Sequence, residues 1–437
     1  MPFDDVVAAG EVPALVSDAA WLRAMLAAEA ALAGAQADVG LVDRAVADEI
    51  AAACEPSRYD LAELSRAAAD AGNPAAPLAR AITGQVGDSA ARYVHFGATS
   101  QDIVDTAAML VARDATAAVR ADLAACCDTL AALAGTHRGT VHVGRTLLQH
   151  ALPTTFGLTA AGWLDGLGRS DSALASVEFA AQLGGAVGTL ASLGSDGPAV
   201  VAAFADRLGL AAPELAWHTD RGRVAELAGA LGRVCGSVAK IAGDVVLLSQ
   251  TEVGELTEEA GAGVGGSSTM PHKRNPVAAV SARAAAARAP GLVSTLLAAM
   301  AHEHQRAAGA WHAEWQPLRE LLRGTGSAVW WLRTSLSRLV VHSDRMLANL
   351  DLTGGALLAE RVTIALAPTV GRLVAHDAVA ECVRAGGDLA ERLAAHPALG
   401  LDRDRAAELL DPAGYLGAAG EFVDRALAAN ARRKELA

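Results

Sequence analysis

The chain has 437 residues, of which 52% are hydrophobic and only 4% aromatic, and it carries a formal net charge of −13 at pH 7. This length allows two or three domains and a large buried core. The negative charge argues against nonspecific nucleic-acid binding, because such binding depends on neutralising phosphates with Lys and Arg. No apolar run approaches the roughly 18 residues of a membrane span, and the N-terminus lacks the features of a secretory signal. We therefore expect a cytoplasmic protein that does not bind nucleic acid or membrane.

The cysteines also limit the classes of function that the chain can have. All five lack CxxC or other metal-ligand spacing, and their odd number and apolar neighbours predict reduced thiols. No metal cluster, phosphate-binding loop or nucleotide fingerprint appears. We expect neither a metal nor a cofactor.

The predicted elements are helices throughout. Residues 1–105 predict shorter helices separated by Pro- and Gly-containing turns, such as the one at 72–74. Residues 106–134 contain no Gly or Pro and repeat apolar side chains at helical spacing, which predicts a long helix. Comparable long segments follow at 157–183, 223–253, 292–316 and 318–350.

These segments predict an all-α fold of three helical domains with a central bundle of five long helices. The expected boundaries are 1–105, 106–350 and 351–437. The central helices are apolar on more than one face, as at 225–249. Because a helix that is apolar all round must be buried on all sides, we infer that bundles from several subunits pack together. A thick monomeric core is the alternative.

One polar segment, 265–276, is predicted to be a loop that runs into a helix. Asn275 is the expected N-cap and Pro276 the first helical residue. A helix N-terminus beside Lys273 suits a carboxylate, and Ser267 adds a hydroxyl for proton transfer on a loop able to close over a substrate. The alternative is a basic surface loop that only caps a helix.

Two further polar segments precede long helices. In 95–106, Thr99 and Asp102 have the spacing of a capping box, so this segment taken alone predicts an ordinary helix cap. In 144–157, His150 taken alone is most simply a capping or core histidine. If the ends of the long helices meet, the three segments together predict one anion site.

These segments carry a resemblance. The residues at 267–276, SSTMPHKRNP, resemble the fumarase/aspartase superfamily pattern GSSxMPxKxNP, and 95–106 and 145–157 resemble that superfamily's two other shared regions in the same order. The resemblance implies three helical domains, a homotetramer with a 20-helix core, and composite active sites built from three subunits. It also implies proton transfer next to a carboxylate, through an aci-carboxylate stabilised by preorganised cations and hydrogen-bond donors.

Finer details favour one branch of that superfamily. Fumarases, argininosuccinate lyases and adenylosuccinate lyases place a His where this chain has Leu147, and adenylosuccinate lyases have a His within the region that reads GNPAAPL at 72–78. By contrast, RTLLQ, PTTFGL, WHT, HEHQRAAGAWHAEW and NLDLTGGALLAE resemble the 3-carboxy-cis,cis-muconate cycloisomerases. The implied reaction is lactonization of 3-carboxy-cis,cis-muconate, in which a substrate carboxylate adds across a double bond and a proton reaches the neighbouring carbon.

The resemblance implies roles for individual residues. Ser267 is the expected acid/base serine, and His150 is a second candidate proton donor. The expected contacts to a small di- or tricarboxylate substrate are Lys273, Asn275, Thr99, Ser100, Gln149, Thr146, Thr154 and Arg221. Four further polar residues are weaker candidates, of which His304 and His312 are alternatively interface groups: His302, His304, His312 and Glu314.

One departure leaves the substrate open. After WHT the chain reads Asp220-Arg221-Gly222-Arg223, where relatives commonly have Gln or Asn at the first position. A carboxylate there repels a tricarboxylate unless Arg221 or Arg223 pairs with it. The alternative function is therefore a fumarate-releasing β-elimination lyase acting on another substituted succinate, for example a nitrosuccinate-type or amino-succinyl substrate. A catalytically silent homologue is disfavoured by the intact Ser267, Lys273 and Asn275.

Overall fold

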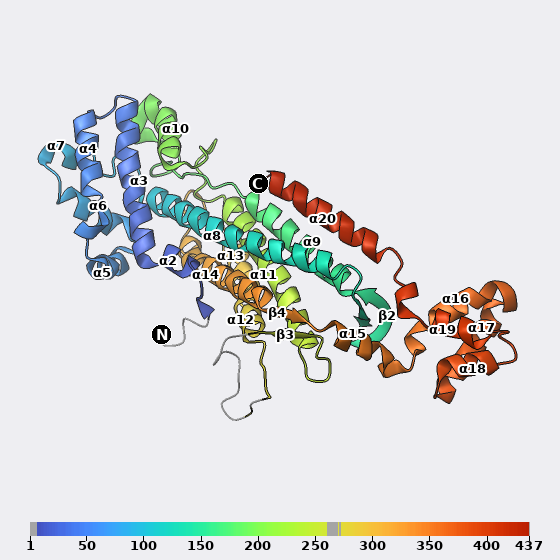
Figure 1. Cartoon of the computed structure of the whole chain (residues 1–437). Coiled ribbons are helices and arrows are strands. Elements are labelled where there is room, and N and C mark those ends of the chain that lie inside the picture. Colours follow the sequence, from blue (N-terminus) through green and yellow to red (C-terminus); the bar gives the residue numbers. More distant parts are fainter. Residues whose placement is uncertain (1–6, 260–269, 271, 437) are drawn as a thin grey trace. The chain divides into compact units, whose positions relative to one another are not determined.

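The computed structural model describes residues 7–259, 270 and 272–436, and it divides the chain into two compact units. Unit 1 comprises residues 1–122, 170–239 and 281–331, and unit 2 comprises 123–169, 240–280 and 332–437. Helices dominate the described residues and the strands are short, which confirms the predicted all-α class (Figure 1). The three-domain division stays a prediction.

The helices and strands have the following bounds. The first half of the chain contains α2 (Val12–Leu15), α3 (Asp18–Asp38), α4 (Arg44–Ala53), α5 (Leu61–Ala71), α6 (Ala75–Thr83), α7 (Asp88–Ala91), α8 (Ser100–Thr136), β1 (Val141–Thr146), β2 (Gln149–Thr155), α9 (Phe156–Ala175) and α10 (Gly197–Leu208). The second half contains α11 (Gly222–Leu248), β3 (Leu256–Glu258), α12 (Val277–Ala286), α13 (Ala289–Ala298), α14 (Ala310–Ser337), β4 (Leu339–Val341), α15 (Ser343–Leu350), α16 (Ala359–Val370), α17 (Arg372–Ala385), α18 (Leu389–Ala395), α19 (Arg403–Leu409) and α20 (Ala419–Leu436).

The helix expected from residue 106 begins earlier. It is α8, which spans 37 residues and includes much of the 95–106 segment. Small and branched apolar side chains such as Ile103, Ala107 and Ala112 are fully buried along it. Because Ala places little bulk between helices, such residues allow neighbouring helices to pack closely.

Two expected helices differ from the structure. The segment 292–316 is not one helix, because α13 ends at Ala298 and α14 begins at Ala310. Between them His304 (φ 49°) and Gly309 (φ 116°) adopt positive φ values, which a right-handed helix excludes. The segment 318–350 is not one helix either, because α14 ends at Ser337 and β4 separates it from α15. At its other end, α14 continues through Pro317, where the sequence predicted a break. A proline removes only one backbone donor, and the surrounding helix tolerates that loss here.

The four strands form two small antiparallel pairs. The pair β1–β2 is a hairpin whose register shifts between Val143 and Arg145. At this irregularity lies Gly144, where an added Cβ would approach the carbonyl oxygen of Leu152 to 2.8 Å. The pair β3–β4 joins residues 256–258 to 339–341.

Each unit has its own helical packing. In unit 1, α3 contacts both α4 and α10. In unit 2, α16 to α19 enclose a separate apolar core that includes Val362, Ala375 and Leu393. Within the described residues, no helix has both the length and the low polarity that crossing a bilayer requires.

Two glycines of α9 give a matched test of this packing. An added Cβ at Gly157 would lie 2.6 Å from the Cα of Arg138 and from the carbonyl oxygen of His137, whereas at Gly162 it would meet nothing within 4 Å. We predict that Gly157→Ala lowers the free energy of unfolding by about 2 kcal/mol, because backbone atoms must move. Gly162→Ala should instead raise it by up to about 1 kcal/mol through helix propensity.

Urea unfolding of both variants, followed by circular dichroism, checks this pair. Equal effects of the two substitutions would contradict the packing described for Gly157.

Candidate active site

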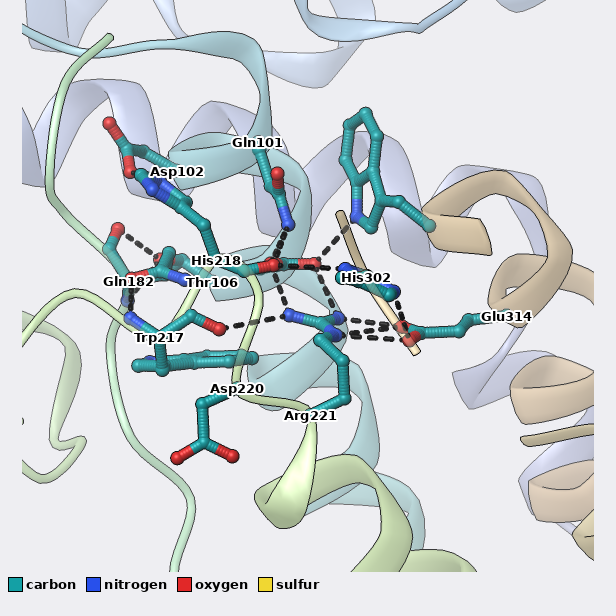
Figure 2. A network of polar contacts seen from close by, with 12 residues as sticks. Gln101, Asp102, Thr106, Gln182, Trp217, His218, Asp220, Arg221, His302 and Glu314 are labelled. Carbon is teal, nitrogen blue, oxygen red and sulfur yellow. Dashed lines mark hydrogen bonds and ion pairs between the residues drawn. The ribbon is translucent and has the colours of Figure 1, made fainter. Parts of the chain in front are cut away.

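Asp102 is the first of several buried carboxylates that organise the predicted site segments (Figure 2). Its Oδ2 accepts hydrogen bonds from the backbone N–H groups of Thr99 and Gly185, each at 2.9 Å. Its Oδ1 accepts one from the backbone N–H of Gly184 at 2.9 Å and one from Nε2 of His218 at 2.6 Å. The bond to Thr99 confirms the capping-box expectation. One carboxylate thus joins the start of α8 to two other segments of unit 1.

Arg221 lies between two further carboxylates, as Figure 2 shows for Glu314. Its Nη2 donates to Glu314 at 2.7 Å, and its Nη1 donates to Asp105 at 2.8 Å. All three side chains are buried. Burial by itself would lower the pKa of Arg221, but the two carboxylates outweigh it and raise the pKa above its ordinary value. The guanidinium therefore stays charged, and removing one partner would leave a buried charge unpaired.

Further polar side chains complete the coordination of the same two carboxylates. Gln101 Nε2 donates to Asp105 at 3.0 Å, and Trp311 Nε1 donates to it at 2.9 Å. A ring nitrogen of His302 lies 3.1 Å from Glu314. Buried carboxylates require such partners, because an unsatisfied one costs several kcal/mol. Through Glu314, His302 is therefore connected to the same network as Arg221.

The loop that precedes α8 is held from its other side by α3. Nδ1 of His95 lies 2.6 Å from Oε1 of the buried Glu29, and Gln36 Nε2 donates to the carbonyl oxygen of Phe96 at 2.7 Å. His95 has a positive φ of 58°, which is uncommon for a residue other than glycine. The backbone at 95–99 is therefore fixed from two directions, and Thr99 and Ser100 lie half-buried at its end.

In unit 2, the hairpin β1–β2 brings three predicted site residues together. Thr146 lies opposite Gln149 at the turn, and His150 follows one position further along β2. Leu147 and Leu148 form the two-residue turn, with φ values of 51° and 63°, and they are 96% and 72% exposed. Thr154 is also on β2 but lies nearer the other end of the hairpin, opposite His142.

Glu255 anchors this hairpin from within unit 2. Its fully buried carboxylate accepts from Arg145 Nη2 at 2.6 Å and from Asn349 Nδ2 at 2.7 Å, and Nδ1 of His142 lies 3.5 Å away. Burial opposes ionisation of Glu255, but hydrogen bonds from His142, Arg145 and Asn349 prevail and lower its pKa to about 2. Glu255 therefore fixes Arg145, the residue paired with His150 across the hairpin.

The surroundings of His150 favour a neutral imidazole. Its Nδ1 is buried and has no hydrogen-bond partner among the described residues. Burial lowers the pKa of His150, the positive charge of Arg145 lowers it further, and Glu255 partly opposes them. The ring is therefore largely neutral at pH 7, with one nitrogen able to accept a proton and the other carrying one.

The third segment is described only in part. Ser267 lies outside the described residues. Lys273 is exposed and Asn275 half-buried. The helix α12 begins at Val277, and Pro276 accepts the backbone bond of Val280, so Pro276 occupies the N-cap position expected for Asn275.

The N-terminus of α12 already holds an anion from the same chain. Glu258 accepts from the backbone N–H groups of Ala278 at 3.0 Å and Ala279 at 2.9 Å, and from the hydroxyl of Ser335 at 2.6 Å. The expectation that these N–H groups receive a substrate carboxylate is therefore corrected. Any anion held beside this helix must rely on side chains such as Lys273 instead.

Sequence reasoning missed Glu255 and Glu258, and it gave Asp102 only a capping role. Neither glutamate lies in a recognisable motif, and their partners are distant along the chain. The sequence feature that could have pointed to these two glutamates is the short polar stretch that follows α11. The predicted residues Thr99, Ser100 and Arg221 belong to unit 1, and Thr146, Gln149, His150, Thr154, Lys273 and Asn275 belong to unit 2.

Removing the charge of Asp102 tests its central place. We predict that Asp102→Asn lowers the free energy of unfolding by roughly 3 kcal/mol, because the amide turns a donor toward groups that are all donors. The matched control is Asp220→Asn, at an exposed aspartate whose recorded bond is to the N–H of Gly222. Thermal unfolding of both variants is the measurement, and similar losses would contradict the role of Asp102.

Glu255 makes stability depend on pH in acid. Its folded-state pKa of about 2 lies below the ordinary 4.5, so its stabilising contribution is complete above pH 4.5 and is lost as the pH falls toward 2. Glu255→Gln should therefore be less stable than the parent at neutral pH, and the difference should shrink below pH 4.5. Glu252→Gln, at an exposed glutamate, is the control. The test is to measure the unfolding midpoints of the parent and of the variants across this pH range. A stability difference between Glu255→Gln and the parent that does not change with pH would contradict the lowered pKa of Glu255.

The chain is similar to known proteins along most of its length. Residues 8–291 match the family model described as "Lyase", and residues 355–426 match "Adenylosuccinate lyase C-terminus". A 3-carboxy-cis,cis-muconate cycloisomerase of Pseudomonas aeruginosa is 48% identical, over 98% of this chain and 95% of its own. A nitrosuccinate lyase of Streptomyces davaonensis is 47% identical, over 95% and 92%. The crystal structure of the 3-carboxy-cis,cis-muconate lactonizing enzyme from Pseudomonas putida superposes with a TM-score of 0.93 at 42% identity, covering 99% of both chains. The chain belongs to this lyase family, within the fumarase/aspartase superfamily.

Proposed function

We propose that this protein is a cycloisomerase that lactonizes 3-carboxy-cis,cis-muconate. The observation that carries the proposal is the 48% identity to a cycloisomerase over nearly the whole chain, including the segments that hold Thr99, Ser100, Gln149 and His150. The reaction is an isomerisation, so a carboxylate oxygen of the substrate bonds to one alkene carbon and a proton adds to its neighbour. The substrate supplies the nucleophile, and the protein needs only anion contacts and one proton donor.

The site residues divide between these two tasks. Ser267 serves as the acid/base group. Lys273 and Asn275 hold one carboxylate, and Thr99, Ser100 and Gln149 contact the others, with Thr146 and Thr154 as additional contacts. Hydrogen-bond donors and a cation held in place stabilise the aci-carboxylate as charge develops on it.

Arg221 takes a supporting role in this proposal rather than the expected contact with substrate. Its side chain is buried, and each of its guanidinium nitrogens donates to Asp105 or Glu314. Moving it onto a substrate would leave two buried carboxylates without their cation. We assign Arg221 to the positioning of α8 and its neighbours.

His150 is the second candidate for proton transfer. A largely neutral imidazole can both donate and accept near neutral pH, which suits general acid–base catalysis. Its position beside Gln149 at the end of the hairpin places it next to a proposed carboxylate contact.

We further propose a homotetramer with a 20-helix core, in which composite sites combine segments of three subunits. Large apolar side chains support packing against other copies, because several on α11 to α13 and just beyond are exposed by 37% or more: Leu247, Val277, Val280, Leu297 and Met300. The cytoplasmic location stays a prediction.

A nitrosuccinate-type substrate is the second candidate, and Asp220 is the feature that favours it. Neither neighbouring arginine is directed to Asp220, because Arg221 bonds to Asp105 and Glu314 while Arg223 pairs with Glu178. Asp220 is exposed, and Figure 2 shows its carboxylate pointing away from the network. A carboxylate that neither arginine neutralises repels a tricarboxylate more than a less charged succinate.

An absorbance assay separates the two candidates. Purified protein should rapidly remove the conjugated-diene absorbance of 3-carboxy-cis,cis-muconate and release a lactone identified by NMR, while nitrosuccinate yields no fumarate. Ser267→Ala should lower kcat by about a thousandfold without altering the assembly. Fumarate release from nitrosuccinate, with the muconate untouched, would overturn the cycloisomerase, and near-parental turnover by Ser267→Ala would remove the serine from its role.

A further inference from the structure

A cavity of about 380 Å³ lies in unit 1, partly open to solvent and lined by side chains from α3, α5, α8 and α14 and from the start of α6. This volume is at the small end of the range for ligand pockets. None of the residues proposed above for proton transfer or substrate contact lines the cavity. The cavity is therefore distinct from the residues proposed to carry out the reaction.

The cavity is mainly apolar. Leu22, Leu78 and Val104 contribute buried side chains to its lining, and Leu64 on α5 adds a half-buried one. A wall of this kind gains free energy by contacting an apolar body, at about 25 cal/mol for each Å² removed from water. The main part of any occupant is therefore apolar.

Two indole rings line the cavity and have unused donors. Trp21 on α3 and Trp315 on α14 both contribute to its wall. Their Nε1 atoms are buried, and neither has a hydrogen-bond partner in the described structure. Buried indole N–H groups normally find an acceptor. Because the two Nε1 atoms are buried, an acceptor in the cavity reaches them only when the side chains rotate toward it.

The charges at the cavity cancel. Arg319 pairs with Asp18 at 2.5 Å, and both line the cavity. Asp18 already neutralises Arg319, so the cavity offers an anionic ligand no net positive charge from this pair. An uncharged acceptor needs no such charge and still satisfies the indole donors.

We propose that this cavity binds a small, uncharged, largely apolar molecule that carries a carbonyl acceptor for the indole N–H groups of Trp21 and Trp315. The site is linked to the buried network through one ring. Trp315 packs edge-on against Trp311 at 4.8 Å between centroids, and Trp311 donates to Asp105. An occupant therefore presses on a ring that adjoins the carboxylates around Arg221.

Acetophenone is a suitable probe, because it joins an apolar ring to one carbonyl. Ligand-observed NMR titration of the full-length protein should give a dissociation constant of the order of 1 mM. Toluene, which lacks the acceptor, should bind roughly fivefold more weakly, the worth of about one hydrogen bond. Benzoate, which is anionic, should also bind more weakly than acetophenone. No saturable binding of acetophenone up to about 10 mM would overturn the proposal.

Matched variants on α5 assign the binding to this cavity. Ala68 lines the cavity, whereas Ala62 is exposed on the same helix and does not. Ala68→Phe should abolish acetophenone binding, and Ala62→Phe should leave it unchanged. Trp21→Phe and Trp315→Phe keep an aromatic ring but remove the donor, so at least one should reduce the preference for acetophenone over toluene to near unity. Binding that survives Ala68→Phe, or a preference that survives both Trp substitutions, would overturn the assignment.

Discussion

A carboxylate buried without partners is too costly to persist, and this constraint organises the segments that carry the proposed chemistry. Asp102 collects four donors from three stretches of chain, and Asp105 and Glu314 share the guanidinium of Arg221. Each carboxylate thereby holds together segments of the chain that are far apart in the sequence. The start of α8, with Thr99 and Ser100, is therefore fixed by charge as well as by apolar packing.

The same principle recurs in unit 2 with different residues. Glu255 ties the hairpin strand that carries Arg145 to Asn349, and Glu258 caps α12. The buried carboxylates bond to segments that carry the proposed contacts, and none of them is itself a proposed contact. Such an arrangement suits a reaction in which the substrate supplies its own nucleophile, because catalysis then depends mainly on donors held in place before charge develops.

What the sequence could predict follows from the range of the interactions involved. Helices such as α8 and α11 are visible in the sequence because their apolar spacing is local. The break at 299–309 is not, because His304 adopts a positive φ value that its residue type does not announce. The break predicted at Pro317 was wrong for the opposite reason, because a proline usually ends a helix but here lies inside α14. Among the proposed site residues, the motifs suggested Thr99, Gln149 and Lys273, whose roles stay predictions. The placement of Arg221 depends on Asp105 and Glu314, which are distant along the chain.

The most direct test is a crystal structure of the enzyme with the carboxymuconolactone product bound. We predict that Thr99 and Ser100 contact one carboxylate of the lactone and that Lys273 and Asn275 hold another. Asp102 should still accept from Thr99, Gly184, Gly185 and His218, and Arg221 should remain between Asp105 and Glu314. A lactone bound directly by Arg221, or one that contacts none of the proposed residues, would contradict this prediction.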